Sequence, residues 1–134
     1  MAVTQGPKLH HVPSEACTGS TAQTDGMTRL AAISGGSVGA RAIWMGQTTV
    51  AAGASSGAHH HGHSETAIYV VSGHPVFIYR EGGREVRLQT KPGDYVFVPP
   101  FVPHIESNAG SLEDAVVVIA RTTQEAIVEN LESL

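Results

Sequence analysis

The chain has 134 residues, of which 41% are hydrophobic and 15% charged, and its formal net charge at pH 7 is -4. This composition predicts one globular domain rather than a disordered segment, and the eight Lys and Arg residues form no basic run, which argues against nucleic-acid binding. The single cysteine, Cys17, excludes an internal disulfide, and no stretch is apolar and long enough for a signal peptide or a membrane span. We therefore expect a soluble, cytoplasmic protein.

The first 26 residues are polar and rich in turn-forming Gly, Pro, Ser and Thr. They predict a loosely ordered N-terminal arm over residues 1–26, followed by a single β-domain over residues 27–134. An extended polar arm can cover the edge strand of a partner subunit. We therefore expect a homodimer.

Short apolar segments separated by turn signals follow from Met27 onward. They predict strands over residues 27–34, 41–50, 66–72, 75–80, 85–90, 94–99 and 114–121. Gly82 and Gly83 indicate a hairpin, because glycine readily supplies the positive φ that tight hairpin turns need. Regular short strands indicate an all-β barrel or sandwich. The tail, residues 122–134, predicts either one short helical turn or a last strand.

A histidine cluster stands out in the middle of the chain, with four of the eight histidines within five residues. The four are His59, His60, His61 and His63, and Glu65 follows them. Imidazole nitrogen and carboxylate oxygen suit zinc, iron, manganese, nickel or copper. In an extended segment His59 and His61 point to one face and His60 to the other. The cluster therefore predicts a metal site.

A second stretch, residues 91–108, contains a turn, a short apolar strand and a proline-rich bend before His104. Together the two stretches resemble the two motifs of the cupin superfamily, in the order that the family has them. The first motif, G-x5-H-x-H-x3-4-E-x6-G, is matched by Gly53, His59, His61, Glu65 and Gly73. The second, G-x5-P-x-G-x2-H-x3-N, is matched by Gly93, Pro99, His104 and Asn108.

This resemblance implies an all-β fold, a single antiparallel β-barrel of the jelly-roll-like, double-stranded β-helix type, holding one divalent transition metal ion. The implied ligands are His59, His61, Glu65 and His104. Fe, Mn, Ni, Cu and Zn all suit such a nitrogen-rich set, so the sequence leaves the identity of the metal open.

Two positions depart from the motifs. Seven residues rather than six separate Glu65 from Gly73, so a register counted from Gly73 places Thr66 at the glutamate position. A one-residue bulge would reconcile the two counts. Without it, Glu65 turns away and leaves a three-histidine site, in which His63 could stand in. Phe101 replaces a motif glycine, and we expect its ring close to the metal.

Other side chains could act beside the metal. His60 and His63 are the candidate catalytic acid–base groups, because they neighbour the ligands and histidine titrates near neutral pH. Arg29 and Arg41 could bind a carboxylate substrate if they point inward. The resemblance implies a mononuclear metalloenzyme acting on a small organic molecule, and we favour a dioxygenase. The alternatives are an isomerase, lyase or decarboxylase, a non-catalytic binding cupin, or a metal that only stiffens the fold.

Overall fold

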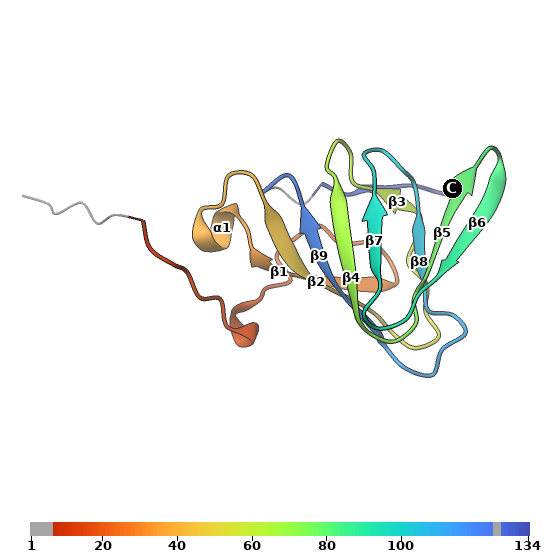
Figure 1. Ribbon diagram of the computed structural model, residues 1–134, viewed down its shortest axis with the longest axis horizontal. Helices are drawn as coiled ribbons and strands as arrows, with labels where there is room; N and C mark the ends of the chain where they lie inside the picture. The colour runs from red at the N-terminus through yellow and green to blue at the C-terminus, as the bar shows by residue number, and fades with distance from the viewer. Residues whose placement is uncertain (1–6, 125–126) are drawn as a thin grey trace, which may run out of the picture.

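The computed structural model describes residues 7–124 and 127–134, and antiparallel β-strands make up most of its regular secondary structure. The first sheet has five strands, in the order β1 (Met27–Ile33), β2 (Trp44–Val50), β9 (Ala115–Arg121), β4 (Thr66–Ser72) and β7 (Tyr95–Val98). The second has three, in the order β6 (Arg84–Gln89), β5 (Val76–Glu81) and β8 (Ile105–Ser107). A small ladder pairs β10 (Glu129–Asn130) with β3 (His59–His60). Figure 1 shows this arrangement.

The predicted all-β, antiparallel fold is confirmed, in a jelly-roll-like form. A backbone bridge between His59 and His104 joins β3 to the chain just before β8, which extends the second sheet. Within the described residues, the strand ladders leave the sheets separate rather than closing them into one hydrogen-bonded barrel. The space between the two sheets is therefore where inward-facing side chains from both sheets meet.

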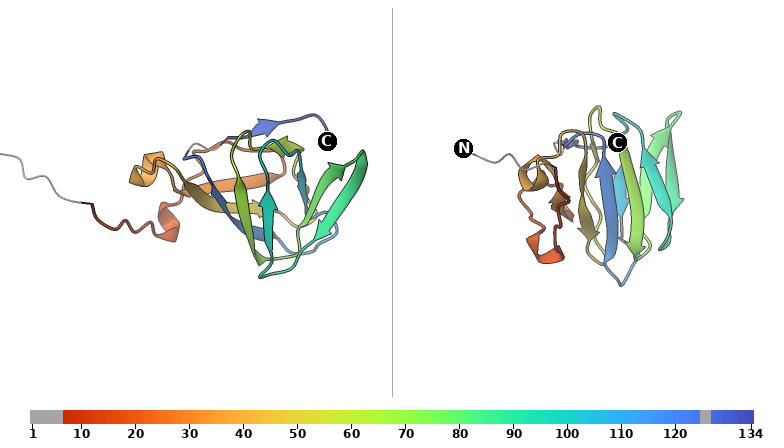
Figure 2. Two further views of the ribbon diagram at one scale, coloured as in Figure 1. Left: turned by 45° about the horizontal axis from the view of Figure 1, so that its top comes forward. Right: turned by 60° about the vertical axis from the view of Figure 1, so that its left-hand side comes forward.

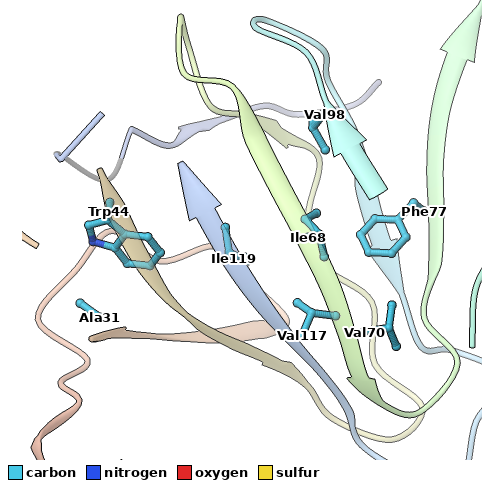
Figure 3. Packing of buried hydrophobic residues seen from close by; sticks show 8 residues of the cluster. All are labelled: Ala31, Trp44, Ile68, Val70, Phe77, Val98, Val117 and Ile119. Carbon is cyan, nitrogen blue, oxygen red and sulfur yellow. The ribbon is translucent and has the colours of Figure 1, made fainter. Parts of the chain in front are cut away.

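The alternation of buried and exposed residues explains how the first sheet is held. In β4 and β9 every second side chain is buried, as expected for strands that present one face to a core. The buried hydrophobic cluster consists of Ala31, Trp44, Ile68, Val70, Phe77, Val98, Val117 and Ile119. Figure 3 shows these side chains, with Phe77 contributed by β5 of the second sheet. Apolar burial between the sheets therefore holds the two layers together.

All seven predicted strands are present, with ends within three residues of the expected positions. The sequence analysis missed β3, β8 and the four-residue helix α1 (Gly35–Val38), which are all too short to show a periodic pattern. Helix α1 is fixed by local capping instead, since the Ser34 side chain accepts a hydrogen bond from the Ser37 N–H. In the tail, β10 is the last strand, while residues 125–126 lie outside the described residues.

The N-terminal arm meets the edge strand β1 of its own chain. After the 3₁₀ turn η1 (Ser14–Ala16), the backbone of Thr18 forms two hydrogen bonds with Ala31, of 3.1 and 2.7 Å. Figures 1 and 2 show the arm and α1 at the β1 side, away from β5 and β6. The expected homodimer stays a prediction, as does the domain boundary at residue 26. None of the described helices has the length and hydropathy needed to span a membrane.

Two glycines with the same backbone conformation differ in their surroundings. Gly73 ends the β4 segment with φ 79°, and a Cβ there would lie 2.7 Å from the carbonyl oxygen of Asp114. Gly83, in the hairpin between β5 and β6, has φ 80°, but nothing lies within 4 Å of a Cβ. The two positions therefore separate the cost of the conformation from the cost of a backbone clash.

Gly73→Ala should lower the free energy of unfolding more than Gly83→Ala. Both changes force a left-handed residue, at about 1–2 kcal/mol, but only Gly73→Ala also presses a methyl group against fixed backbone. Thermal unfolding of the two variants, followed by circular dichroism, measures the difference. Equal melting temperatures would show that the close approach at Gly73 does not constrain the fold.

Candidate metal centre

Three histidines converge between the two sheets. His59 lies in β3, His61 follows two residues later, and His104 comes just before β8. The His59 N–H donates to the carbonyl of His104 (3.1 Å), and the His104 N–H donates back (2.9 Å). All three residues are buried, and one nitrogen of each ring lies within 4.8 Å of the other two. The backbone pairing therefore places three imidazoles around one point.

Hydrogen bonds to backbone carbonyls fix which nitrogen of each ring faces that point. The Nδ1 contacts are His59 to Gly57 O (2.9 Å), His61 to Ile127 O (3.0 Å) and His104 to Val102 O (3.0 Å). A carbonyl only accepts, so each Nδ1 carries the proton and each Nε2 keeps its lone pair. This is the arrangement in which a second-sphere acceptor orients a metal-binding imidazole. Each of the three Nε2 atoms can thus donate its lone pair to a metal ion.

The three imidazoles are neutral at physiological pH. Burial, followed by the charge of His104, lowers the pKa of His59 to about 3. Burial also lowers the pKa of His104 to about 4, against the opposing hydrogen bond to Val102. The pKa of His61 is strongly lowered as well, by burial and then by the positive charge of Arg121. Neutral imidazole is the form that binds a metal ion.

Arg29, on β1, points into the space between the two sheets, which we call the chamber. The sequence analysis named Arg29 and Arg41 as candidates for this inward position. Arg29 is fully buried, and its guanidinium contacts the Ala22 carbonyl (3.2 Å) and the Met27 sulfur (3.3 Å). Burial lowers its pKa to about 10, so it keeps its positive charge at neutral pH. The other candidate, Arg41, is exposed before β2 and lies outside the chamber.

Two further inward residues were missed by the sequence analysis. Arg121, at the end of β9, is 1% exposed and lies over the Trp44 ring at 4.7 Å. Burial, and then the charge of Arg29, lowers its pKa to about 9. Glu106 is also buried, and burial raises its pKa to about 7 against the opposing charge of Arg29. Alternation could have found both, because Arg121 follows inward Ile119 and Glu106 follows inward His104 by two residues.

The expected fourth ligand, Glu65, lies outside the group of three histidines that the structure brings together. Its side chain is exposed, and its backbone is held by Thr122 through the hydroxyl (3.0 Å) and the N–H (3.2 Å). Thr66 takes the inward position instead and is fully buried. The register does shift in β4, but between Val70 and Ser72. Because this shift lies after Glu65 in the chain, it does not turn the Glu65 side chain inward.

Three other expected site residues also lie away from the group. His60 is on the opposite face of β3, as alternation predicts, where its Nδ1 accepts a hydrogen bond from the Gly62 N–H (3.0 Å). His63 is exposed. Phe101 is 62% exposed, and its ring lies 5.9 Å from that of His60. Its φ of 63° explains why the motif has glycine there. The positions of His60 and His63 lend no support to the predicted acid–base roles.

An apolar pocket reaches one member of the histidine group, His104. Its volume is about 250 Å³, and it lies between β5–β6 and β7. Phe77, Leu88, Val98 and Val102 are among its apolar lining residues, and His104 is its only ionisable lining residue other than Tyr79 among those described. A small, partly apolar molecule could therefore approach the imidazoles by this route.

Solved structures with similar folds include two oxalate enzymes and a protein described as a cysteine peptidase. Peruvianin-I, a cysteine peptidase from Thevetia peruviana latex, has a TM-score of 0.71 and 14% identity, and the match covers 86% of this chain and 74% of that one. The oxalate decarboxylase of Bacillus subtilis has a TM-score of 0.70 and 20% identity, over 81% of this chain and 28% of that one. An oxalate oxidase in complex with the substrate analogue glycolate has a TM-score of 0.70 and 16% identity, over 85% of this chain and 58% of that one. This chain thus spans less than two thirds of the two oxalate enzymes. At these identities the likeness shows the fold alone, and no curated protein matches the sequence.

The cupin domain is recognised in the sequence over residues 46–120, which is more than half of the chain. This range contains all three converging histidines. The two histidine motifs agree with this match, and so do the jelly-roll-like sheets. The chain therefore belongs to the cupin family.

Proposed function

We propose that this protein is a mononuclear metal-dependent enzyme that acts on a small organic molecule. The observation that carries the proposal is the convergence of three buried imidazoles, each with its Nδ1 bonded to a backbone carbonyl and its Nε2 without a hydrogen bond among the described residues. Adventitious histidine runs lack such second-sphere support. The same geometry makes His59, His61 and His104 the proposed ligands.

The donor set suits a divalent transition metal such as Fe, Mn, Ni, Cu or Zn. Three protein ligands leave coordination positions open, unlike a closed structural site with four. A metal ion bound in this way supplies Lewis-acid polarisation of substrate oxygens and, if it is redox-active, activation of dioxygen. Among the similar structures, the oxalate decarboxylase of B. subtilis is described with Mn(II) centres, but we leave the metal here to be measured.

The chain itself shapes the reaction space. The apolar pocket between β5–β6 and β7, which we call the approach pocket, has apolar walls that limit the water beside His104. Across the chamber from the three histidines, the buried Arg29 and Arg121 form a positively charged wall. An open metal position at the inner end of an apolar pocket favours a catalytic site over a metal that only stiffens the fold. Within this class we propose a dioxygenase, with an isomerase, lyase or decarboxylase as the alternative.

Reconstitution with metals tests the enzyme proposal. The metal-free protein is loaded anaerobically with Fe(II), Mn(II), Ni(II) or Zn(II), its metal content is measured, and oxygen uptake is screened with small organic substrates. Metal-dependent oxygen uptake supports a dioxygenase. Turnover without oxygen uptake points to the isomerase, lyase or decarboxylase class. Metal binding without turnover of any substrate would favour a binding cupin.

Ligand variants test the site directly. His61→Ala and His104→Ala should each lower metal affinity by about tenfold or more, because each removes one inward Nε2. His60→Ala is the matched control, since its ring lies on the opposite face of β3, and Glu65→Ala should also leave the metal content unchanged. Elemental analysis after dialysis measures all four. Equal loss in His60→Ala would mean that the run is a flexible chelator.

Acid should destabilise the metal-free protein. The folded pKa values of His59 and His104 are about 3 and 4, and that of His61 is also lowered, whereas an unfolded histidine has a pKa of about 6.5. Below about pH 6.5 the unfolded chain therefore binds more protons than the folded chain, and the free energy of unfolding decreases as the pH is lowered. Glu106, with its pKa raised to about 7, opposes this by one proton.

The net effect of three histidines against one carboxyl is a loss of about 2–3 kcal/mol per pH unit between pH 6 and 5. Urea unfolding at several pH values measures this slope. Removing one buried imidazole in His61→Gln should reduce the slope by about half. A free energy of unfolding that does not change between pH 7 and 5 would contradict the assignment of three buried neutral histidines.

A further inference from the structure

The Arg121 guanidinium is buried without a hydrogen-bonding partner. The residue is 1% exposed, and none of its three nitrogens has a hydrogen-bond acceptor among the described residues. Its contact with the Trp44 ring, at 4.7 Å, satisfies the face of the guanidinium but none of its N–H groups. A buried charge without a partner is costly, so the fold keeps five unused donors at this position.

Neighbouring groups show the same deficit. Thr66 lies directly across from Arg121 in the β4–β9 ladder, and its buried hydroxyl also lacks a partner among the described residues. The Arg29 Nε is likewise unpaired there. The ion pairs of residues 7–124 and 127–134 are Arg87–Glu85 and Lys91–Asp94, so neither arginine forms one with a described carboxylate. The buried Glu106 interacts electrostatically with Arg29, but not within ion-pair distance. The wall opposite the histidines is therefore positively charged and rich in unused donors.

The apolar pocket and this wall lie on the same inner face of the first sheet. Val98, which lines the pocket, pairs with Thr66 in the β4–β7 ladder, and Thr66 pairs with Arg121 in the next. The three side chains thus form one row across the inner face of the first sheet. Within this row, Thr66 is the residue that lies between the pocket-lining Val98 and Arg121.

We propose that Arg121, assisted by Thr66, binds the carboxylate of a small organic acid whose apolar part lies in the pocket between β5–β6 and β7. The planar guanidinium matches a carboxylate through two parallel hydrogen bonds. The apolar lining suits a hydrocarbon group rather than a second polar end. As a substrate assignment, this inference rests on the proposed metalloenzyme function, but the carboxylate subsite itself does not require the metal.

The test compares two ligands of the same shape in the metal-free protein. Benzoate and benzamide differ in charge but hardly in size, so isothermal titration of both isolates the contribution of the carboxylate. Benzoate should bind the natural chain at least about tenfold more tightly than benzamide. Arg121→Gln should abolish this preference, and the matched control Arg41→Gln, at an exposed arginine, should keep it. Equal binding of the two ligands, no binding of benzoate, or a preference that survives Arg121→Gln would overturn the proposal.

A stability measurement separates binding from a structural role. If Arg121 only supports the fold through Trp44, Arg121→Met should lower the melting temperature of the ligand-free protein. If it is an unused binding group, removal of its unpaired charge should leave that temperature unchanged or raise it, while the stabilisation by benzoate is lost. A lower melting temperature combined with a retained benzoate effect would contradict the subsite.

Metal content measured on the same samples distinguishes this inference from the proposed function. Metal binding by the natural chain without a benzoate preference removes the carboxylate subsite alone. A benzoate preference without metal binding supports the subsite and removes the metalloenzyme proposal. Arg121→Gln should keep its metal, because the guanidinium is not one of the proposed ligands.

Discussion

The two backbone hydrogen bonds between His59 and His104 are the contact on which the site depends. They join a two-residue strand to the chain before β8, and so bring together segments that are 45 residues apart in the sequence. Once this bridge forms, strand alternation turns both side chains to the inner face, and His61 joins them two residues later. The Nδ1 hydrogen bonds then fix the rings, so that the position of three donors follows from main-chain pairing rather than from flexible side-chain choice.

The chamber between the sheets is electrostatically divided. One wall presents neutral imidazoles, whose pKa values are lowered by burial, and the other presents Arg29 and Arg121. With Glu65 outside, the proposed ligands contribute no negative charge, so a divalent ion would remain uncompensated by its ligands. An anionic organic ligand would balance both walls at once. The ligand set and the buried arginines therefore favour the same class of substrate.

Most of the fold and the three histidines that converge could be predicted from the sequence. Apolar alternation located the long strands and placed His59 and His61 on one face, and the resemblance to the second cupin motif added His104. Glu65 was misplaced because a change of one residue in register moves a side chain to the opposite face, and only tertiary pairing fixes that register. Alternation could have turned Arg121 inward, but its neighbours could not be predicted, because Thr66 and Trp44 are distant in the sequence and become adjacent only through β9.

Nuclear magnetic resonance of the ¹¹³Cd-loaded protein with ¹⁵N-labelled histidine tests the central claim most directly, because coupling to ¹¹³Cd identifies each ligating nitrogen. We expect coupling at the Nε2 atoms of three histidines, His59, His61 and His104, each with a protonated Nδ1. Coupling through Nδ1, or to His60 or His63 in place of one of the three, would contradict the account.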